Sequence, residues 1–394
     1  MSDKYLKVIY MKSQNISPRF SYIYYLLSAL IILSSCHGAH DNGLRGLKDE
    51  FNDAFLIGTA MNRRQISGED TSSIKIIETH YNTITPENIT KWQVIHPKPG
   101  EFNFEPADQF VEFGEKNGMF MVGHTLVWHS QTPGWVFLDE KGNPADRETL
   151  LERMREHIHT VVGRYKGRIQ GWDVVNEALN EDGTLRESPW YRIIGKEYLV
   201  KAFEYAREAD PDAELYYNDY NLEDPVKRAG AVKLVHYLQE NGAPITGIGT
   251  QSHLHLTTPS LHEIERTITD FAGLGIDVMI TELEIDVLPY PTGYFQGIDL
   301  SLIDRNEEGI NPYTDGLPDD VQAELAQRYR DVFEVYVEHK DVITRVTFWG
   351  VNDGNTWKNN YPARGRTNHP LLFDREWQPK PAFYELIDVA GTGQ

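Results

Sequence analysis

The run Trp172-Asp173-Val174-Val175-Asn176-Glu177 decides the fold, because it is a short apolar strand pattern that ends abruptly in two polar side chains. A second run, Val278-Met279-Ile280-Thr281, is followed in the same way by Glu282. Short runs rich in β-branched residues are typical of strands buried in a parallel sheet. A carboxylate directly after such a strand is either buried with a partner or takes part in catalysis.

Six further runs of this kind occur along the chain, and helix-like stretches with charged faces separate them, such as Arg147–Tyr165 and Asp319–His339. Alternating strands and helices indicate parallel β/α units, and eight units predict an α/β fold of the closed (β/α)₈ TIM barrel type. The expected strands are Phe55–Ala60, Tyr81–Thr85, Met119–His124, Ile169–Asn176, Glu214–Asn218, Ile245–Ser252, Asp277–Leu283 and Arg345–Val351.

A doubly wound open sheet is the alternative fold. The first expected strand is not followed by a glycine-rich phosphate-binding loop, since Ile57-Gly58-Thr59-Ala60 does not have that pattern. Polar and aromatic residues cluster at the carboxyl ends of nearly all the expected strands, and a barrel brings these ends together at one mouth. The length alone would allow two or three domains, but residues 44–394 show no linker, so we expect a single catalytic domain.

Charge and cysteine content exclude several classes of protein. The chain has 38 lysines and arginines against 59 aspartates and glutamates, a formal net charge of −21, which disfavours binding to nucleic acid. The only cysteine is Cys36, so no disulfide can form within the chain and sites built from several cysteines are excluded.

The first 36 residues read as a bacterial lipoprotein signal peptide. A basic start precedes the apolar run 22–33, which is shorter than the about 20 residues that span a bilayer. The run ends in Leu33-Ser34-Ser35-Cys36, which resembles a lipobox whose cysteine is acylated. We therefore expect export and lipid anchoring at the cell envelope or surface, with residues 37–43 as a short tether. A plain secretory signal is the alternative, and Met11 is an alternative start.

Histidines raise the possibility of a metal site. His253 and His255 lie two residues apart at the carboxyl end of the sixth expected strand, and His124 ends the third. Barrel metallohydrolases use such ligands, but Gln251 and aromatic residues, rather than carboxylates, lie near this pair. We therefore predict no metal site.

Paired carboxylates indicate glycoside hydrolysis, because one must donate a proton to the leaving oxygen while the other attacks or stabilises the sugar carbon. Glu177 and Glu282 lie at the carboxyl ends of the fourth and seventh expected strands and can face each other across the mouth. Flat aromatic rings that stack on sugars also lie at or after strand ends, namely Trp92, Trp128, Trp349 and Trp357.

These motifs resemble the glycoside hydrolase family 10 endo-β-1,4-xylanases, and the resemblance runs from about Phe55 to about Leu386. The segments that carry it are Glu87-Asn88 with Lys91-Trp92, Gly123-His124-Thr125-Leu126-Val127-Trp128-His129, Trp172-Asp173-Val174-Val175-Asn176-Glu177-Ala178, Gln251-Ser252-His253, Ile280-Thr281-Glu282-Leu283, and Trp349-Gly350 with Asp353-Gly354 and Trp357.

The resemblance implies a cofactor-free (β/α)₈ xylanase that acts on xylan and xylo-oligosaccharides with retention, and we expect a monomer. It implies that Glu177 is the general acid/base, Glu282 is the nucleophile, and His253 keeps Glu282 ionised. Asn176 would bind the 2-hydroxyl of the reacting sugar, with Gln251 nearby. Further cleft residues would be Asn218 and, on the aglycone side, Tyr220; the glycone side would be lined by Glu87, Asn88, Lys91, His124, Trp128, Trp349 and Trp357.

Two features depart from the family pattern. Glu284 stands where an aspartate is usual, which predicts a rearranged hydrogen-bond network with His253. The segment from Pro289 to Leu317 is long for a loop, and its tyrosines Tyr290, Tyr294 and Tyr313 could extend the cleft. Two other functions stay open at this stage: a related β-1,4-glucanase, and a xylan-binding protein without catalysis, which would have no need to keep both glutamates.

Overall fold

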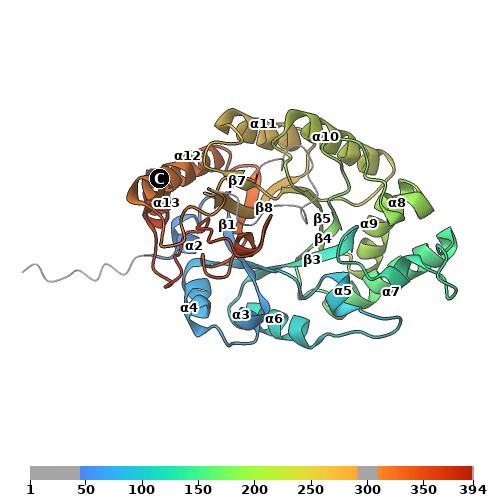
Figure 1. Cartoon of the computed structure of the whole chain (residues 1–394). Helices are drawn as coiled ribbons and strands as arrows, with labels where there is room; N and C mark the ends of the chain where they lie inside the picture. Colours follow the sequence, from blue (N-terminus) through green and yellow to red (C-terminus); the bar gives the residue numbers. More distant parts are fainter. Residues whose placement is uncertain (1–44, 292–308, 393–394) are drawn as a thin grey trace, which may run out of the picture. The chain divides into compact units, whose positions relative to one another are not determined.

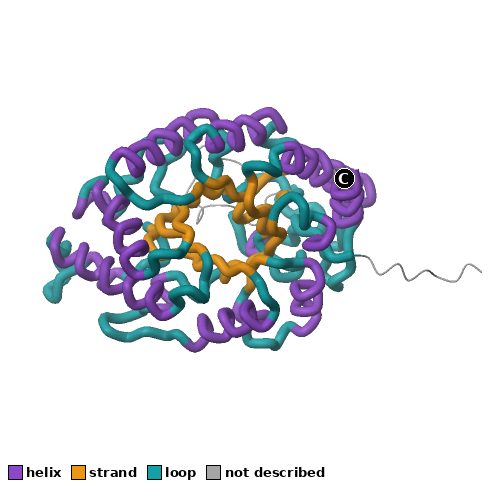
Figure 2. Tube along the Cα trace, turned by 180° about the vertical axis from the view of Figure 1, so that it is seen from behind, coloured by secondary structure: helices purple, strands orange, loops and turns teal. Residues whose placement is uncertain are grey.

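Eight parallel strands close into a barrel, and helices surround it (Figure 1). Each strand pairs with the next, and closure comes from the pairing of β9 with β1 and of β6 with β8. Seen from behind, the strands form a central ring within a ring of helices (Figure 2). This confirms the (β/α)₈ prediction and excludes the open sheet. The barrel strands are β1 (Leu56–Met61), β2 (Thr83–Pro86), β3 (Phe120–Trp128), β4 (Gly171–Asn176), β5 (Glu214–Asp219), β6 (Gly247–Thr250), β8 (Asp277–Asp286) and β9 (Ile343–Phe348).

The computed structural model describes residues 45–291 and 309–392. The expected signal peptide, Cys36, the tether 37–43 and Tyr294 lie outside these residues. Within the two described ranges, no helix combines the length and apolar character needed to cross a membrane.

The helices follow the expected alternation. The two predicted from their charged faces are α7 and α12, each within one residue of its predicted end. Asp146 caps α7 by accepting a hydrogen bond from the backbone N–H of Thr149. The helices are α2 (Leu47–Glu50), α3 (Arg63–Ile66), α4 (Thr71–His80), α5 (Trp92–Ile95), α6 (Glu105–Lys116), α7 (Arg147–Arg164), α8 (Pro189–Ile194), α9 (Glu197–Ala209), α10 (Pro225–Glu240), α11 (Leu261–Ala272), α12 (Asp319–Glu338) and α13 (Pro381–Thr392).

Strands β3 and β8 are longer than predicted and carry polar residues within the strand. Strand β8 continues past Glu282 to Asp286 because a short strand, β7 (His253–His255), pairs with its last residues, His253 opposite Glu284. The sixth expected strand, Ile245–Ser252, is correspondingly short, and Ser252 turns the chain with a left-handed φ of 54°. Glutamates 282 and 284 are therefore held by a strand rather than by a loop.

Close packing of β3 on β4 depends on one glycine. Trp172 of β4 is fully buried, and a Cβ at Gly123 would lie 2.1 Å from its ring. Only glycine allows this close approach, which places the polar end of β3 beside β4, the strand that carries Asn176.

The long segment between β8 and α12 is described only at its ends. The ring of Tyr290 lies 5.9 Å from that of His255, and the carbonyl of Tyr313 lies 3.1 Å from His369 Nε2. The two described tyrosines therefore pack against His255, at the end of β7, and against His369, in the segment that follows β9.

Candidate active site

Glu177 follows β4 in a left-handed conformation, with φ 57°, and its N–H donates to the carbonyl of Asn218 at 2.9 Å. A non-glycine residue in this conformation is uncommon and must be held by its surroundings. Trp128 Nε1 donates to Glu177 Oε2 at 2.8 Å. Asn176 Nδ2 and Gln251 Nε2 lie 3.2 and 3.1 Å from Glu177 Oε1. The half-buried carboxyl group is thus oriented by three neighbouring side chains.

Glu282 lies within β8 and is only 5% exposed. Asn218 Nδ2 donates to its Oε1 at 2.9 Å, and His253 Nε2 lies 3.3 Å from its Oε2. Burial alone would raise the pKa of Glu282, but the hydrogen bond from His253 and attraction to His124, His253 and Lys91 outweigh burial and lower it. Glu282 is therefore a buried carboxylate held in its ionised form.

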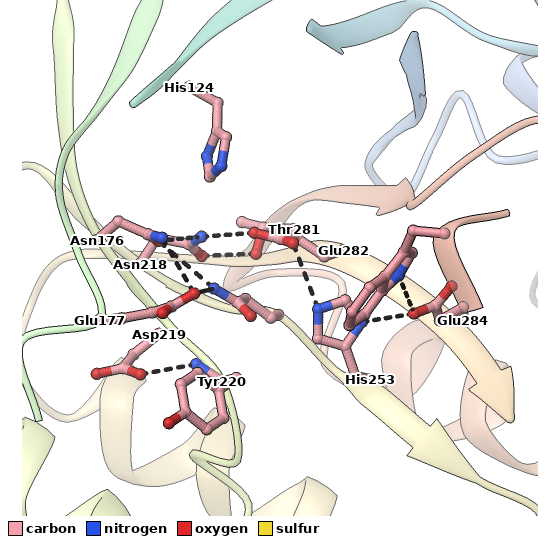
Figure 3. A network of polar contacts seen from close by, with 12 residues as sticks. His124, Asn176, Glu177, Asn218, Asp219, Tyr220, His253, Thr281, Glu282 and Glu284 are labelled. Carbon is pink, nitrogen blue, oxygen red and sulfur yellow. Dashed lines mark hydrogen bonds and ion pairs between the residues drawn. The ribbon is translucent and has the colours of Figure 1, made fainter. Parts of the chain in front are cut away.

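Two amide side chains connect the glutamates (Figure 3). Asn176 donates to Glu177, and its Oδ1 accepts a hydrogen bond of 3.0 Å from Asn218, which also donates to Glu282. Thr281 Oγ1 donates to Asn218 Oδ1 at 2.6 Å, which fixes the orientation of that amide. The two carboxyl groups predicted from strand ends are thus brought together across the mouth of one barrel.

Behind Glu282, Glu284 is fully buried and accepts hydrogen bonds from His253 Nδ1 at 2.9 Å and Trp357 Nε1 at 2.7 Å. Burial tends to lower the pKa of His253, but its hydrogen bonds to Glu282 and Glu284 dominate and raise it to about 9. The longer Glu284 side chain thus still reaches His253. Asp286 and Glu284 share the ammonium group of Lys358, whose Nζ lies 3.5 Å from Asp286 Oδ2 and 3.8 Å from Glu284 Oε1.

Other predicted residues of the glycone side gather near the pair. Lys91 donates to Asn88 Oδ1 at 3.0 Å and lies 5.0 Å from the centre of the Trp128 ring. Burial lowers the pKa of Lys91, and burial raises the pKa of Glu87. His124 pairs with Asp173 at 2.8 Å, and its ring lies 5.3 Å from that of Trp349.

Comparison with known proteins gives the family. The model of glycosyl hydrolase family 10 matches residues 46–389. The chain belongs to glycosyl hydrolase family 10. It is 44% identical over 343 residues to endo-1,4-beta-xylanase A of Xylanibacter ruminicola, covering 87% of this chain and 93% of the relative. It is 44% identical over 376 residues to a beta-1,4-xylanase of Dictyoglomus thermophilum, covering 94% and 99%. A family 10 endoxylanase from a sugarcane soil metagenome superposes with a TM-score of 0.82 at 46% identity, covering 88% and 99%. Membership confirms the glycoside hydrolase class inferred from the motifs.

Trp92, one of the four tryptophans expected at or just after strand ends, packs in the core of this family 10 barrel. Trp92 is only 2% exposed, and its ring stacks on that of His157 at 3.7 Å. It lies in the first turn of α5, whose buried face packs into the core. A tryptophan that follows a strand end closely in sequence can thus face inward once a helix begins there.

The histidines considered as metal ligands are engaged with protein groups. His253 contacts a carboxylate through each ring nitrogen, and His124 contacts Asp173. His255 Nε2 lies 3.2 Å from the carbonyl of Leu288. Their geometry serves hydrogen bonding within the barrel mouth.

Sequence reasoning missed two cations on the side of Glu177. Arg186 donates from Nε to the carbonyl of Glu177 at 3.2 Å and from Nη2 to the hydroxyl of Tyr220 at 3.1 Å. Lys227, in the first turn of α10, is fully buried beside Asp219. Arg186 could have been noticed as the one cation in the acidic and polar segment 180–187. Lys227 gives no such signal, since a lysine near a helix start usually faces solvent.

Replacing His253 by alanine is expected to move the acidic limb of the pH–activity profile to higher pH. When Glu282 loses the hydrogen bond from His253, burial is opposed less strongly and the pKa of Glu282 rises. Glu282 then becomes protonated at a higher pH, so activity is lost there. The pH dependence of kcat/KM measures this; an unchanged acidic limb would show that His253 does not control Glu282.

The same substitution alters stability with a defined sign. The pKa of His253 in the fold, about 9, lies above its ordinary value of 6.5. Its stabilising contribution is therefore complete below pH 6.5 and is lost as the pH rises through about 9. Urea unfolding at pH 6 and at pH 10 should show a smaller difference between wild type and the alanine variant at the higher pH.

Proposed function

We propose that this protein is a retaining endo-1,4-β-xylanase that cleaves internal bonds of xylan, with Glu177 as general acid/base and Glu282 as nucleophile. The main support for the proposal is that the two carboxyl groups, linked through Asn176 and Asn218, have different surroundings. Glu282 is buried, and the pKa of its carboxyl group is lowered by His253 and by neighbouring charges. Glu177 is half-buried and accepts a hydrogen bond from Trp128 Nε1.

In the first step, Glu282 attacks the anomeric carbon while the proton of Glu177 passes to the glycosidic oxygen. The bond to the aglycone breaks as the bond to Glu282 forms, and the shortened chain leaves with that proton. Asn176 is proposed to hold the 2-hydroxyl of this sugar. Its Oδ1 accepts from Asn218, so the amide is already oriented before substrate arrives.

In the second step, ionised Glu177 takes a proton from water, and the resulting hydroxide oxygen attacks the anomeric carbon. Glu282 leaves as a carboxylate, and the product retains the original anomeric configuration after two inversions. Gln251 and Trp128 keep Glu177 in place through both steps, since each donates a hydrogen bond to one of its oxygens.

Xylan is the substrate favoured by the relatives, which are called xylanases or endoxylanases. The buried Trp349 beside His124 and the half-buried Trp357 beside His253 support a narrow glycone side, where the hydroxymethyl group of a glucose unit would need extra room. The β-1,4-glucanase reading is therefore the second candidate. We further propose that the enzyme acts as a monomer.

Product analysis separates these functions. Xylan, mixed-linkage glucan and cellulose should be incubated with equal amounts of enzyme, and the released oligosaccharides followed with time. The proposal expects short xylo-oligosaccharides of several lengths from the start and little release from the glucans. Release of xylose alone, faster cleavage of glucan, or binding without any product would overturn it.

We also propose, from the residues that precede the barrel, that the enzyme is an exported lipoprotein acylated at Cys36. Replacing Cys36 by serine should move the protein from the membrane fraction to the soluble fraction, because no other thiol can carry the acyl chain. Specific activity should stay the same, since the catalytic residues all come from the barrel. Retention in the membrane fraction after this change would contradict the anchor.

A further inference from the structure

We infer that Lys227 is a positioning residue for departure of the aglycone, acting through Tyr220 and through the turn that carries Glu177. The inference rests on the proposed role of Glu177 as the acid/base. Lys227 touches neither glutamate of the catalytic pair in any recorded contact. It supports Tyr220 and the turn after Glu177, which form the leaving-group side of the site.

Lys227 is completely buried, which is rare for a lysine and costly unless the charge is compensated. Its Nζ lies 3.1 Å from Asp219 Oδ1 and 3.3 Å from Glu181 Oε1. It also lies 3.4 Å from the centre of the Tyr220 ring, a close cation–π contact. One ammonium group therefore joins α10, the end of β5 and the segment that follows β4.

Asp219 passes this constraint to the turn after Glu177. Its Oδ2 accepts hydrogen bonds from the N–H of Leu179 at 3.3 Å and from the hydroxyl of Tyr217, which itself accepts from the N–H of Ala178. Its Oδ1 accepts from the N–H of Tyr220 at 2.9 Å. The two residues after Glu177 are thus held by groups that Lys227 keeps in place.

Asp219 needs that cation to act as an acceptor. Burial raises the pKa of Asp219 to about 6, and attraction to Lys227 is the largest influence that lowers it. Without Lys227, Asp219 would take up a proton more readily and one of its oxygens would become a donor. The hydrogen bond from the N–H of Leu179 or of Tyr220 would then be weakened, and the left-handed turn at Glu177 would lose support.

Tyr220 is fixed from two directions. Lys227 covers one face of the ring, and Arg186 holds the hydroxyl group. Figure 3 shows Tyr220 and Asp219 on the side of Glu177 that faces away from Glu282. A proton donor lies on the leaving-group side of the scissile bond, so this half-buried ring is placed to meet the departing sugar.

The test is the variant Lys227→Met, which keeps the length of the side chain and removes its charge. Its kcat/KM on xylopentaose should fall by about 10- to 100-fold, the scale of a small misplacement of reacting groups. On 2,4-dinitrophenyl β-xylobioside, whose leaving group needs neither a proton nor an aglycone sugar, kcat/KM should stay within about threefold.

Lys380→Met is the matched control. Lys380 is also buried and pairs with a buried aspartate, Asp353, at 3.0 Å, but none of its recorded partners contacts Glu177 or Tyr220. This variant should lose stability and affect both substrates equally. Lys227→Met should lower kcat/KM on xylopentaose less in the Tyr220→Ala variant than in the wild type, because both residues act on the same side of the site.

Equal losses on both substrates in Lys227→Met, or no loss on xylopentaose, would overturn the inference. If Lys227→Met fails to fold, Lys227→Gln is measured in its place. If both Lys227 variants fail to fold while Lys380→Met folds, Lys227 has a role in folding only, which also contradicts the inference. Glu177→Ala, assayed in parallel, separates the two claims. If this variant loses equal activity on xylopentaose and on the dinitrophenyl substrate, the proposed role of Glu177 is refuted rather than the role of Lys227.

Discussion

Glu282→Ala is expected to lose hydrolysis of every substrate by at least about 10⁴-fold, because it removes the proposed nucleophile that forms the covalent intermediate. The loss should extend to dinitrophenyl β-xylobioside, since a good leaving group does not replace a missing nucleophile. Initial rates on this substrate and on xylopentaose measure both effects.

Azide provides the control for Glu282→Ala. The space left by the side chain should admit this small anion, which attacks the dinitrophenyl substrate once and gives the α-glycosyl azide, of inverted configuration. Glu284→Ala serves for comparison: it alters the hydrogen bonds of His253 and Trp357 but leaves Glu282 in place, so it should lose less activity and gain no such azide product. Wild-type rates in Glu282→Ala would exclude it as the nucleophile.

Glu177→Ala should produce a loss that depends on the leaving group. Hydrolysis of xylan and xylopentaose should fall by about 10²- to 10⁴-fold, the usual contribution of a positioned general acid. For dinitrophenyl β-xylobioside, kcat/KM should change little, because it reports formation of the intermediate without acid assistance. Its kcat should fall, because the water that cleaves the intermediate has lost its base.

In Glu177→Ala, azide should raise kcat on the dinitrophenyl substrate and give the β-glycosyl azide. Retained product in this variant and inverted product in Glu282→Ala would together assign the two roles. Equal sensitivity of good and poor leaving groups to Glu177→Ala would assign the proton transfer to another residue.

The sequence singled out the proposed catalytic pair because a polar residue after an apolar strand is unusual. Glu177 and Glu282 both stand out in this way, and a parallel barrel brings such ends to one mouth. Periodicity could not show that β8 continues past Glu282, because that extension depends on pairing with β7, a strand of three residues that starts after a left-handed turn.

Trp92 and Lys227 show what local patterns omit. The tryptophan lies soon after β2, as sugar-binding rings do, but a short helix begins there and turns it toward His157. The lysine looks like a solvated residue at a helix start, and only the packing of α10 against the end of β5 buries its charge beside Asp219. Both outcomes depend on tertiary contacts that a run of residues does not contain.

Glu284 shows why the effect of a longer acid cannot be predicted from sequence alone. One added methylene suggested a rearranged network, and Glu284 accepts hydrogen bonds from His253 Nδ1 and from Trp357 Nε1. Whether a longer acid reaches its partner depends on where the backbone of β8 places its Cα, which is set by pairing with β7.

Trapping of the covalent intermediate is the most direct test that Glu282 is the nucleophile. Incubation with 2,4-dinitrophenyl 2-deoxy-2-fluoro-β-xylobioside slows the second step more than the first, so the glycosyl enzyme accumulates. Proteolysis and tandem mass spectrometry then locate the label. We expect one fluoroxylobiosyl group per molecule on Glu282, distinguished by fragmentation from the nearby Glu284. A label on any other residue, or full inactivation without a covalent label, would contradict it.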